Sequence, residues 1–245
     1  MPYPNFKDKH LQEALFHPRD YIKYRKLKKN LPKKYILTYQ GTAKNYFIKK
    51  YKPKRIKNLE LVMAYRYKNM GFIFMPGIGS PHAVTALEEM IALGGKEFIN
   101  IGTAGGLHKQ GVFLCIKALR DEGTSYHYLP DGKFSYPDKK LTKELERSIE
   151  KLGLKYTEGT TWTIDAPYRE TKKEIEHYVK EGISTVEMET SALFTVAKYR
   201  KVKIASAFIV SDVLGEKWNP GFHKFDVKRA QNILIDAAVD CLSKK

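Results

Sequence analysis

The segment Val186-Glu-Met-Glu189 places two carboxylates on either side of a methionine. On an extended backbone, side chains two positions apart point to the same side, so Glu187 and Glu189 are expected to face one pocket with Met188 beside them. Carboxylate oxygens accept hydrogen bonds, and the two hydroxyls of a vicinal diol must each donate one, so the pair suits such a diol. The alternative is a solvated helix N-terminus, because a stretch rich in Ala, Leu and Val follows and acids favour that end of a helix.

Two glycine-rich segments are candidates for holding an anion. Gly77-Ile-Gly79 precedes Ser80 and Pro81, a good N-cap and a good first helical residue. Gly102-Thr-Ala-Gly-Gly106 is expected to be a loop after a buried strand, with the Thr103 hydroxyl as an extra donor. Backbone N–H groups in such turns bind phosphate and similar anions, although each segment alone also fits an ordinary turn. No Walker-type lysine follows either segment, and no dinucleotide fingerprint is complete.

Apolar runs and helical stripes alternate along the chain. The runs predict buried strands at 72–75, 98–101 and 204–210, the last ending at Ser211-Asp212. Helical periodicity predicts helices from Ser80 to a stop at Gly94, and at 141–152, 170–181, 190–200 and 226–242. Strands that alternate with helices indicate an α/β fold, here a three-layer α/β/α arrangement with a central mixed sheet. We expect residues 1–35 to form a basic helical extension and residues 36–245 to form a single domain.

Ligands of such sheets bind beyond the carboxyl ends of the strands. The polar residues at those ends therefore form the expected site: Gly77, Gly79, Thr103, Glu187, Glu189 and Asp212.

The net charge of +17 is concentrated at the start of the chain. Residues 1–60 hold 17 Lys and Arg against 4 Asp and Glu, whereas the remaining 185 residues hold 27 against 23. A nucleic-acid-binding arm is one interpretation. A solvated basic face is the interpretation we favour, because no stacking platform or nucleic-acid-binding motif is complete.

Cysteine usage and hydropathy limit the other classes. Cys115 and Cys241 lie in apolar segments without metal-ligand spacing, which predicts buried free thiols, a reducing compartment and no metal site. No apolar run approaches the roughly 18 residues of a membrane span. The first ten residues lack the apolar region of a secretory signal, so we expect a cytoplasmic protein that does not act at a membrane.

Five motifs occur in the order and spacing of the nucleoside phosphorylase-I family, which this chain resembles over about residues 60–245. They are Gly77-Ile-Gly-Ser-Pro81, Ile101-Gly-Thr-Ala-Gly105, Arg120-Asp-Glu-Gly123, Val186-Glu-Met-Glu-Thr-Ser-Ala192 and Ile209-Val-Ser-Asp212. The family includes uridine and purine nucleoside phosphorylases and the methylthioadenosine and AMP nucleosidases. The resemblance implies cleavage of the N-glycosidic bond of a nucleoside, with phosphate as co-substrate and no other cofactor. It also implies a homo-oligomer, either a dimer or a trimer of dimers.

The resemblance assigns the sugar and phosphate contacts. Glu189 is similar to the carboxylate that holds the ribose 2′- and 3′-hydroxyls, with Glu187 and Met188 in the same pocket. His10 is similar to a histidine that touches the 5′-hydroxyl across a subunit interface. The phosphate contacts implied are Thr103, Gly77, Gly79, Lys44 as the nearest basic residue of the first loop, and Arg66 reaching into a neighbouring subunit.

The base contacts are assigned in the same way. Asp212 resembles the general acid that protonates N7 of a departing purine. The segment Thr161–Glu170 matches the loop that faces the base, and Asp165, Tyr168 and Arg169 are its candidate contacts.

Two departures from the family concern phosphate. The family's Gly-Asp-Pro-x-Arg loop is replaced by Ile36–Lys44, and Asn100 stands where the phosphorylases carry arginine. A lysine is not geometrically equivalent to an arginine fork. Asn100 is similar to the hydrolytic nucleosidases, whereas the retained Arg66 favours phosphorolysis.

The preferred base is open between two branches of the family. The Gly-Ser-Pro helix start is similar to uridine phosphorylases, but the Gln-x-Arg pair that reads uracil is absent. Asp212 favours purines. The sequence therefore predicts a nucleoside phosphorylase with purine favoured over uridine. A nucleosidase is the alternative enzyme, and a non-catalytic nucleoside- or nucleic-acid-binding protein is the alternative outside enzymes.

Overall fold

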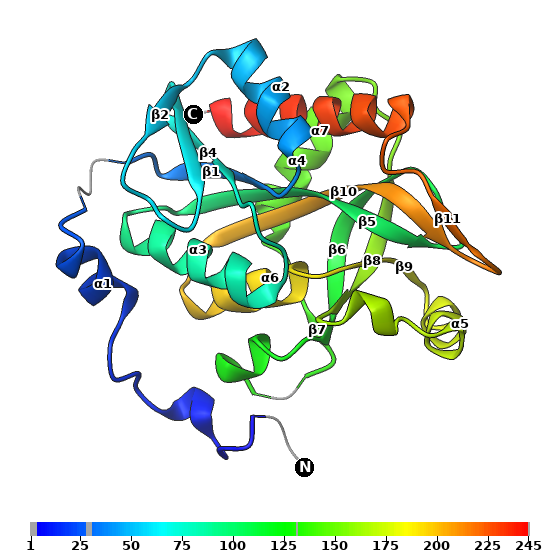
Figure 1. Cartoon of the computed structure of the whole chain (residues 1–245), viewed down its shortest axis with the longest axis horizontal. Coiled ribbons are helices and arrows are strands. Elements are labelled where there is room, and N and C mark those ends of the chain that lie inside the picture. The colour runs from blue at the N-terminus through cyan, green and yellow to red at the C-terminus, as the bar shows by residue number, and fades with distance from the viewer. Residues whose placement is uncertain (1–3, 28–30, 131, 245) are drawn as a thin grey trace.

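The computed structural model of the chain describes residues 4–27, 31–130 and 132–244. Figure 1 shows a central sheet with helices on both sides. The strands are β1 (Lys34–Thr38), β2 (Lys54–Ile56), β3 (Met63–Tyr67), β4 (Met70–Phe74), β5 (Glu97–Leu107), β6 (Val112–Asp121), β7 (Phe134–Ser135), β8 (Thr157–Ile164), β9 (Ile183–Glu187), β10 (Lys203–Leu214) and β11 (Trp218–Pro220). The helices are α1 (Pro18–Tyr24), α2 (Gly41–Tyr51), α3 (Ser80–Ala92), α4 (Lys139–Lys151), α5 (Lys172–Lys180), α6 (Thr190–Tyr199) and α7 (Phe225–Ser243), with short 3₁₀ turns at Lys9–Leu11, Ser125–His127 and Pro167–Arg169.

Over the residues that the structure describes, the sheet is mixed and has 11 strands, in the order β11-β10-β6-β8-β9-β5-β1-β4-β3-β2, with β7 paired to β6. Strands β1, β4 and β5 run parallel to one another, and β10 runs parallel to β5. Because β5 pairs with β9 as well as with β10, strands β5, β10, β6, β8 and β9 close into a ring. The predicted three-layer α/β/α fold is confirmed, and half of its sheet curls on itself.

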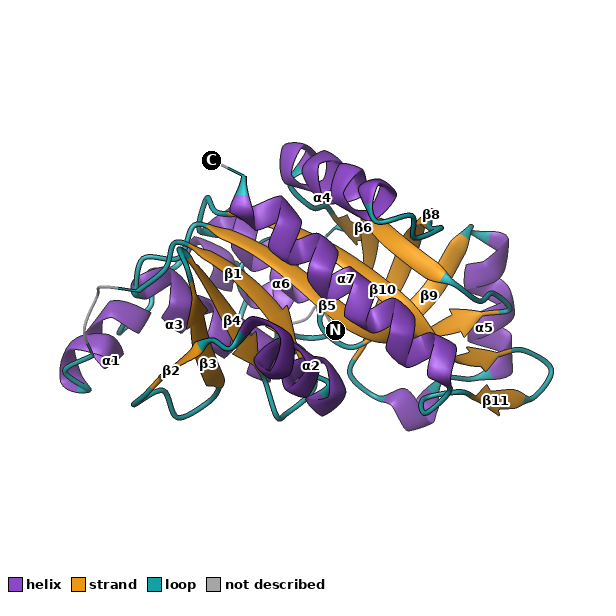
Figure 2. Cartoon of the chain, turned by 90° about the horizontal axis from the view of Figure 1, so that it is seen from above, coloured by secondary structure: helices purple, strands orange, loops and turns teal. Residues whose placement is uncertain are grey.

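Each face of the sheet carries its own hydrophobic core (Figures 1 and 2). Helices α3 and α6 pack together on one face, where Leu87 and Phe194 are buried. Helices α2, α4 and α7 cover the other face, around Phe72 and Leu234. Helix α1 packs on α3 and adds Ile22 to the first core. Two-sided burial explains why the central strands are continuous apolar runs rather than alternating ones.

The expected helices at 141–152, 170–181, 190–200 and 226–242 correspond to α4, α5, α6 and α7. Helix α3 starts at Ser80, one residue earlier than expected, so the prediction of Ser80 as N-cap is wrong: Gly79 is the N-cap and has φ 96°, a conformation that favours glycine. Both cysteines are buried free thiols, which confirms that prediction. No helix in the described ranges is long and apolar enough to cross a membrane.

Two strands are longer than expected. Residues 102–106 were expected to form a loop, but they continue β5 to Leu107 and pair with β9 and β10. A Cβ on Gly105 would lie 2.5 Å from Leu214 Cδ1, and one on Gly106 would collide with the Lys109 carbonyl. The glycines therefore allow three strands to approach closely, which a single-chain pattern does not reveal. Likewise β10 does not stop at Ser211 but runs to Leu214 past an irregularity at that residue.

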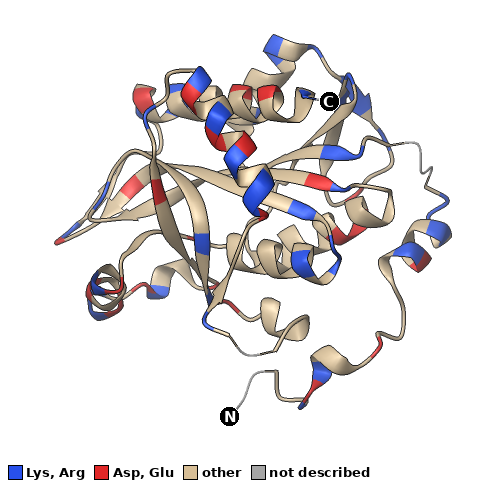
Figure 3. Cartoon of the chain, turned by 180° about the vertical axis from the view of Figure 1, so that it is seen from behind, with Lys and Arg blue, Asp and Glu red and all other residues tan. Residues whose placement is uncertain are grey.

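The N-terminal segment runs along the outside of the body and contacts it through α1 (Figure 1). Figure 3 shows Lys and Arg spread over α1, α2 and β2, on the part of the chain that carries most of the net charge. The division into an extension and a domain at residue 35 stays a prediction.

Candidate functional site

A cavity of about 810 Å³ opens at the carboxyl ends of β1, β5, β9 and β10. This is the edge of the sheet at which the sequence placed the site. Its lining residues come from those strand ends, from the loop after β8 and from the β10–β11 hairpin: Tyr39, Gln40, Ile78, Thr103, Ala104, Gly105, Pro167, Tyr168, Glu170, Val186, Glu187, Met188, Glu189, Ser211, Asp212, Leu214, Trp218 and Phe222.

Glu187 ends β9, and both of its carboxylate oxygens are occupied by protein donors. Oε2 accepts from the amides of Glu189 (2.9 Å) and Thr190 (2.7 Å) and from Thr190 Oγ1 (2.7 Å). Oε1 accepts from Thr163 Oγ1 at 2.5 Å. Burial raises the pKa of Glu187, and these donors oppose the rise. Glu187 thus binds the first amides of α6 and fixes the segment that carries Met188 and Glu189.

Glu189 is held by the glycine segment before α3. Its Oε1 accepts from the Gly79 amide at 2.5 Å, and Ser80 Oγ donates to the Met188 carbonyl at 2.7 Å. Burial, followed by the charge of Glu187, raises the pKa of Glu189 to about 8. The raised pKa favours the protonated form of this carboxyl, which can both donate to and accept from a diol.

These contacts show that the segment Gly77–Gly79 positions Glu189, in addition to the phosphate binding expected of it. Gly77 and Gly79 were expected to bind phosphate, but the Gly79 amide is bonded to Glu189, and an anion there would have to displace a carboxylate. A Cβ on Gly77 would lie 3.3 Å from the His82 ring. Of this segment, Ile78 lines the cavity. Phosphate binding by Gly77 and Gly79 stays a prediction.

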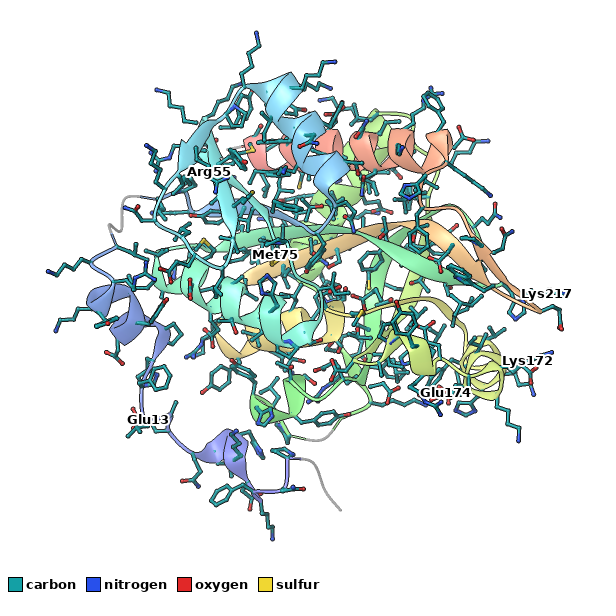
Figure 4. The ribbon with its side chains drawn as sticks, viewed as in Figure 1. Glu13, Arg55, Met75, Lys172, Glu174 and Lys217 are labelled. Carbon is teal, nitrogen blue, oxygen red and sulfur yellow. The ribbon has the colours of Figure 1, made fainter. Side chains whose placement is uncertain are left out.

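Asp212 lies beside the irregularity in β10, at a separate part of the cavity wall. Its Oδ1 accepts from Ser211 Oγ and its Oδ2 from Trp218 Nε1, both at 2.8 Å. Trp218 belongs to β11, which pairs with the end of β10. Figure 4 labels Lys217 in the turn between these strands, on the same side of the molecule as Lys172 of α5. Lys172 Nζ donates to Glu216 in that turn at 2.9 Å, so an exposed ion pair links α5 to the hairpin.

Glu170 is a second carboxyl in the part of the cavity wall that contains Asp212, and no sequence pattern pointed to it. Burial, followed by the charges of Asp212 and Glu174, raises the pKa of Glu170 to about 7. It follows the 3₁₀ turn Pro167–Arg169, in a loop without periodicity. The only sequence signal was its place in the loop expected to face the base.

A polar chain leads from β1 to Thr103. Thr38 Oγ1 donates to Gln40 Oε1 at 3.2 Å, and Gln40 Nε2 donates to Thr103 Oγ1 at 3.1 Å. Because Thr103 accepts from Gln40, its own O–H is oriented to donate elsewhere. Asn100, on the same strand as Thr103, is 1% exposed, donates to Ser206 Oγ at 3.3 Å and does not line the cavity.

The structure brings six of the expected contacts to the cavity: Thr103, Tyr168, Glu187, Met188, Glu189 and Asp212. Seven others are outside its lining: Gly77, Gly79, His10, Lys44, Arg66, Asp165 and Arg169. Lys44 lies over the Phe74 ring at 4.8 Å, and Arg169 is exposed outside the lining. His10 and Asp165 line a separate groove of about 1030 Å³ beside the N-terminal segment.

Arg66 lines a cavity of about 380 Å³ with Lys33, Lys34 and Lys68, near the amino end of β1. The roles expected of His10 and Arg66 involve a neighbouring subunit and stay predictions.

The ionisable carboxyl, amine and guanidinium groups in the described cavity lining are all carboxyls. Among the described residues that line it, none is Lys, Arg or His, and four are carboxyls: Glu170, Glu187, Glu189 and Asp212. Within the described ranges, no three His, Cys, Asp or Glu side chains gather as a metal site.

The Arg120–Gly123 motif does not line the cavity, but it forms hydrogen bonds to α6 and to the loop after β8. Glu122 accepts from Ser191 Oγ of α6 and from the Ser125 amide, both at 2.8 Å. The Gly123 amide donates to Asp165 Oδ2 at 2.7 Å. Asp165, expected at the base, thus joins two loops in this structure.

Comparison with known proteins finds one matching family model and several relatives. The model, described as the phosphorylase superfamily, matches residues 45–243. A uridine phosphorylase of Treponema pallidum (strain Nichols) is 28% identical over 153 residues, 56% of this chain and 59% of the relative. A purine nucleoside phosphorylase of Plasmodium vivax (strain Salvador I) is 28% identical over 163 residues, 63% and 66% of the two chains. The matched part thus spans less than two thirds of these relatives.

Among solved structures, an AMP nucleosidase from Bacteroides thetaiotaomicron VPI-5482 superposes with a TM-score of 0.75 at 23% identity. The match covers 91% of this chain and 97% of that one. At this identity the likeness supports the fold.

Proposed function

Because the chain belongs to the phosphorylase superfamily, we propose that it cleaves the N-glycosidic bond of a purine nucleoside with phosphate, releasing the base and ribose 1-phosphate. The observation that carries the proposal is that Glu189, held against Gly79, and Asp212, held by Trp218, line one cavity. One group suits the sugar and the other the departing base.

On the sugar side, the C1′–N bond loosens before the new bond forms, so the ribose becomes oxocarbenium-like. Glu189 binds the 2′- and 3′-hydroxyls, and Met188 packs beside the sugar. Glu187 keeps this segment in place through four donors and so preorganises the contact.

On the base side, a proton must reach N7 as the purine leaves. Asp212 donates it, which is general acid catalysis. Glu170 lies in the same half of the cavity, and with a pKa of about 7 it is half protonated near neutral pH. It can therefore return a proton to Asp212. Tyr168, Trp218 and Phe222 offer aromatic surface to the base.

The attacking phosphate oxygen is placed by the Thr103 O–H, at the end of the Thr38–Gln40 chain. The charge of phosphate requires a cation from outside this lining. We propose that Lys44, or Arg66 of a neighbouring copy in a homo-oligomer, supplies it.

Hydrolysis is the second candidate, and one observation favours it. The described lining holds four carboxyls and no cation, which disfavours a phosphate dianion and suits water. The AMP nucleosidase neighbour and Asn100 point the same way.

The experiment is base release from inosine, adenosine and uridine, each with and without phosphate. We expect release that requires phosphate and is faster with the purines. Release that is equal without phosphate would establish hydrolysis, and faster release from uridine would remove the role of Asp212 as the N7 acid. No release from any of the three would overturn the proposal.

A further inference from the structure

Tyr39 is the first residue after β1 and lines the cavity. Its hydroxyl oxygen is buried and has no hydrogen-bond partner among the described residues. The ring lies over β5, where an added Cβ on Gly102 would be 3.8 Å from Tyr39 Cδ2. Gln40, the next residue, donates to Thr103. Tyr39 therefore places a phenol in the wall of the cavity that Thr103 also lines.

The groups around this phenol fix its protonation state. Burial, then the charges of Glu189 and Glu187, raise the pKa of Tyr39 well above its ordinary value. The hydroxyl thus stays protonated at any pH at which the protein works, and it is a hydrogen-bond donor.

A buried hydroxyl without a partner destabilises a fold, and phenylalanine would supply the same ring without that penalty. The tyrosine needs a partner that the described protein groups do not supply. In the proposed function the ribose 2′- and 3′-hydroxyls are bound by the Glu189 carboxyl. The attacking oxygen is an acceptor, and in this cavity it meets no lysine, arginine or histidine from the described lining.

We propose that Tyr39 is a substrate-binding residue whose phenol O–H donates to the attacking oxygen, in the cavity that Thr103 also lines. The inference rests on the proposed function and names a contact within that site. Two neutral donors then hold the nucleophile in a cavity whose described lining has no cation. The same donor serves a phosphate oxygen or a water, and the two sources are separated by the phosphate dependence of the reaction.

The test uses Tyr39→Phe with Tyr35→Phe as its matched control. Tyr35 lies on β1, the strand that Tyr39 follows. Its hydroxyl is also buried without a partner among the described residues, but it does not line the cavity. Both variants remove one unpartnered hydroxyl, so we expect neither to lower the melting temperature. We expect Tyr39→Phe to lower kcat/KM for phosphate by roughly 10- to 100-fold, the range for a lost hydrogen bond to a charged group. KM for the nucleoside and all constants of Tyr35→Phe should stay within about twofold of wild type.

A second readout does not depend on turnover. Inorganic phosphate should raise the melting temperature of the wild type and of Tyr35→Phe, and raise that of Tyr39→Phe less at the same concentration. If the wild type releases base without needing phosphate, the attacking oxygen is water, and Tyr39→Phe should lower kcat while leaving the nucleoside KM unchanged.

Three results would overturn the inference. They are wild-type kinetics for Tyr39→Phe, an effect confined to the nucleoside KM, and an activity loss that Tyr35→Phe shares. An inactive wild type would instead remove the proposed function, so the two failures are told apart by the wild-type assay alone.

Discussion

The two halves of the cavity are built differently. The sugar half is made of buried groups: Glu187 and Glu189 are each 7% exposed, and both are bonded to backbone amides. The base half includes exposed side chains: Tyr168 is 99% exposed and Trp218 is 62% exposed. The sugar half is thus part of the core, whereas the base half is attached to its surface.

The difference fits the proposed roles of the two halves. A ribose diol is the same in every nucleoside, so its site can be fixed by the fold itself. The base varies, and a site made of a loop and a hairpin can change without disturbing the sheet. Relatives named for uridine and for purine nucleosides are consistent with that division.

The largest effect is expected from breaking the sugar half. Glu187→Ala leaves the amides of Glu189 and Thr190 and the Thr163 hydroxyl without their acceptor. We expect the free energy of unfolding to fall by about 3 kcal/mol, since each buried unsatisfied donor costs about 1–3 kcal/mol. Urea denaturation would show a lower midpoint with an unchanged slope.

The control for that variant comes from the base half. Trp218→Phe removes one donor to Asp212 on an exposed strand, and its unfolding free energy should stay within about 0.5 kcal/mol of wild type. Equal losses for the two variants would contradict the distinction between the halves.

A change in the base half should alter the rate and not the fold. Asp212→Asn keeps the shape of the side chain but cannot give a proton to N7. We expect kcat/KM for inosine to fall by about 100-fold, the lower range for general acid catalysis, with the melting temperature unchanged. Uridine, which has no N7, serves as the internal control, and an equal loss with uridine would assign Asp212 a positioning role instead.

The sequence predicted the parts of the site that local patterns determine. Apolar runs located β4, β5 and β10, and the helix signals located α3 and α6. Thr103, Glu189 and Asp212 then met in one cavity because they lie near the carboxyl ends of strands that share an edge.

Other features depend on partners far away in the sequence. The four donors of Glu187 include Thr163, 24 residues earlier, and the Gly105 backbone faces Leu214 and Val186. Tyr39 and Glu170 carry no periodic or motif signal, and their importance comes from what surrounds them in the fold. A polar-tipped aromatic at a strand end beside Gln40 was the one available hint for Tyr39.

The smallest expected effect is a difference in how the carboxyls of the two halves make stability depend on pH. Glu189 and Glu170 have raised pKa values, about 8 and about 7, so the folded state binds protons that the unfolded state has released. Stability should therefore fall as pH rises from about 4.5, the ordinary glutamate value, to about 8 for Glu189 and to about 7 for Glu170. Glu189→Gln should remove the larger part of this slope. Glu170→Gln should remove less, because its carboxyl is partly exposed and screened by solvent. Urea midpoints at pH 5, 6, 7 and 8 measure both slopes. A wild type whose stability rises over that range would contradict the raised pKa values of Glu189 and Glu170. A larger change in Glu170→Gln than in Glu189→Gln would mean that the base half is the more tightly buried of the two.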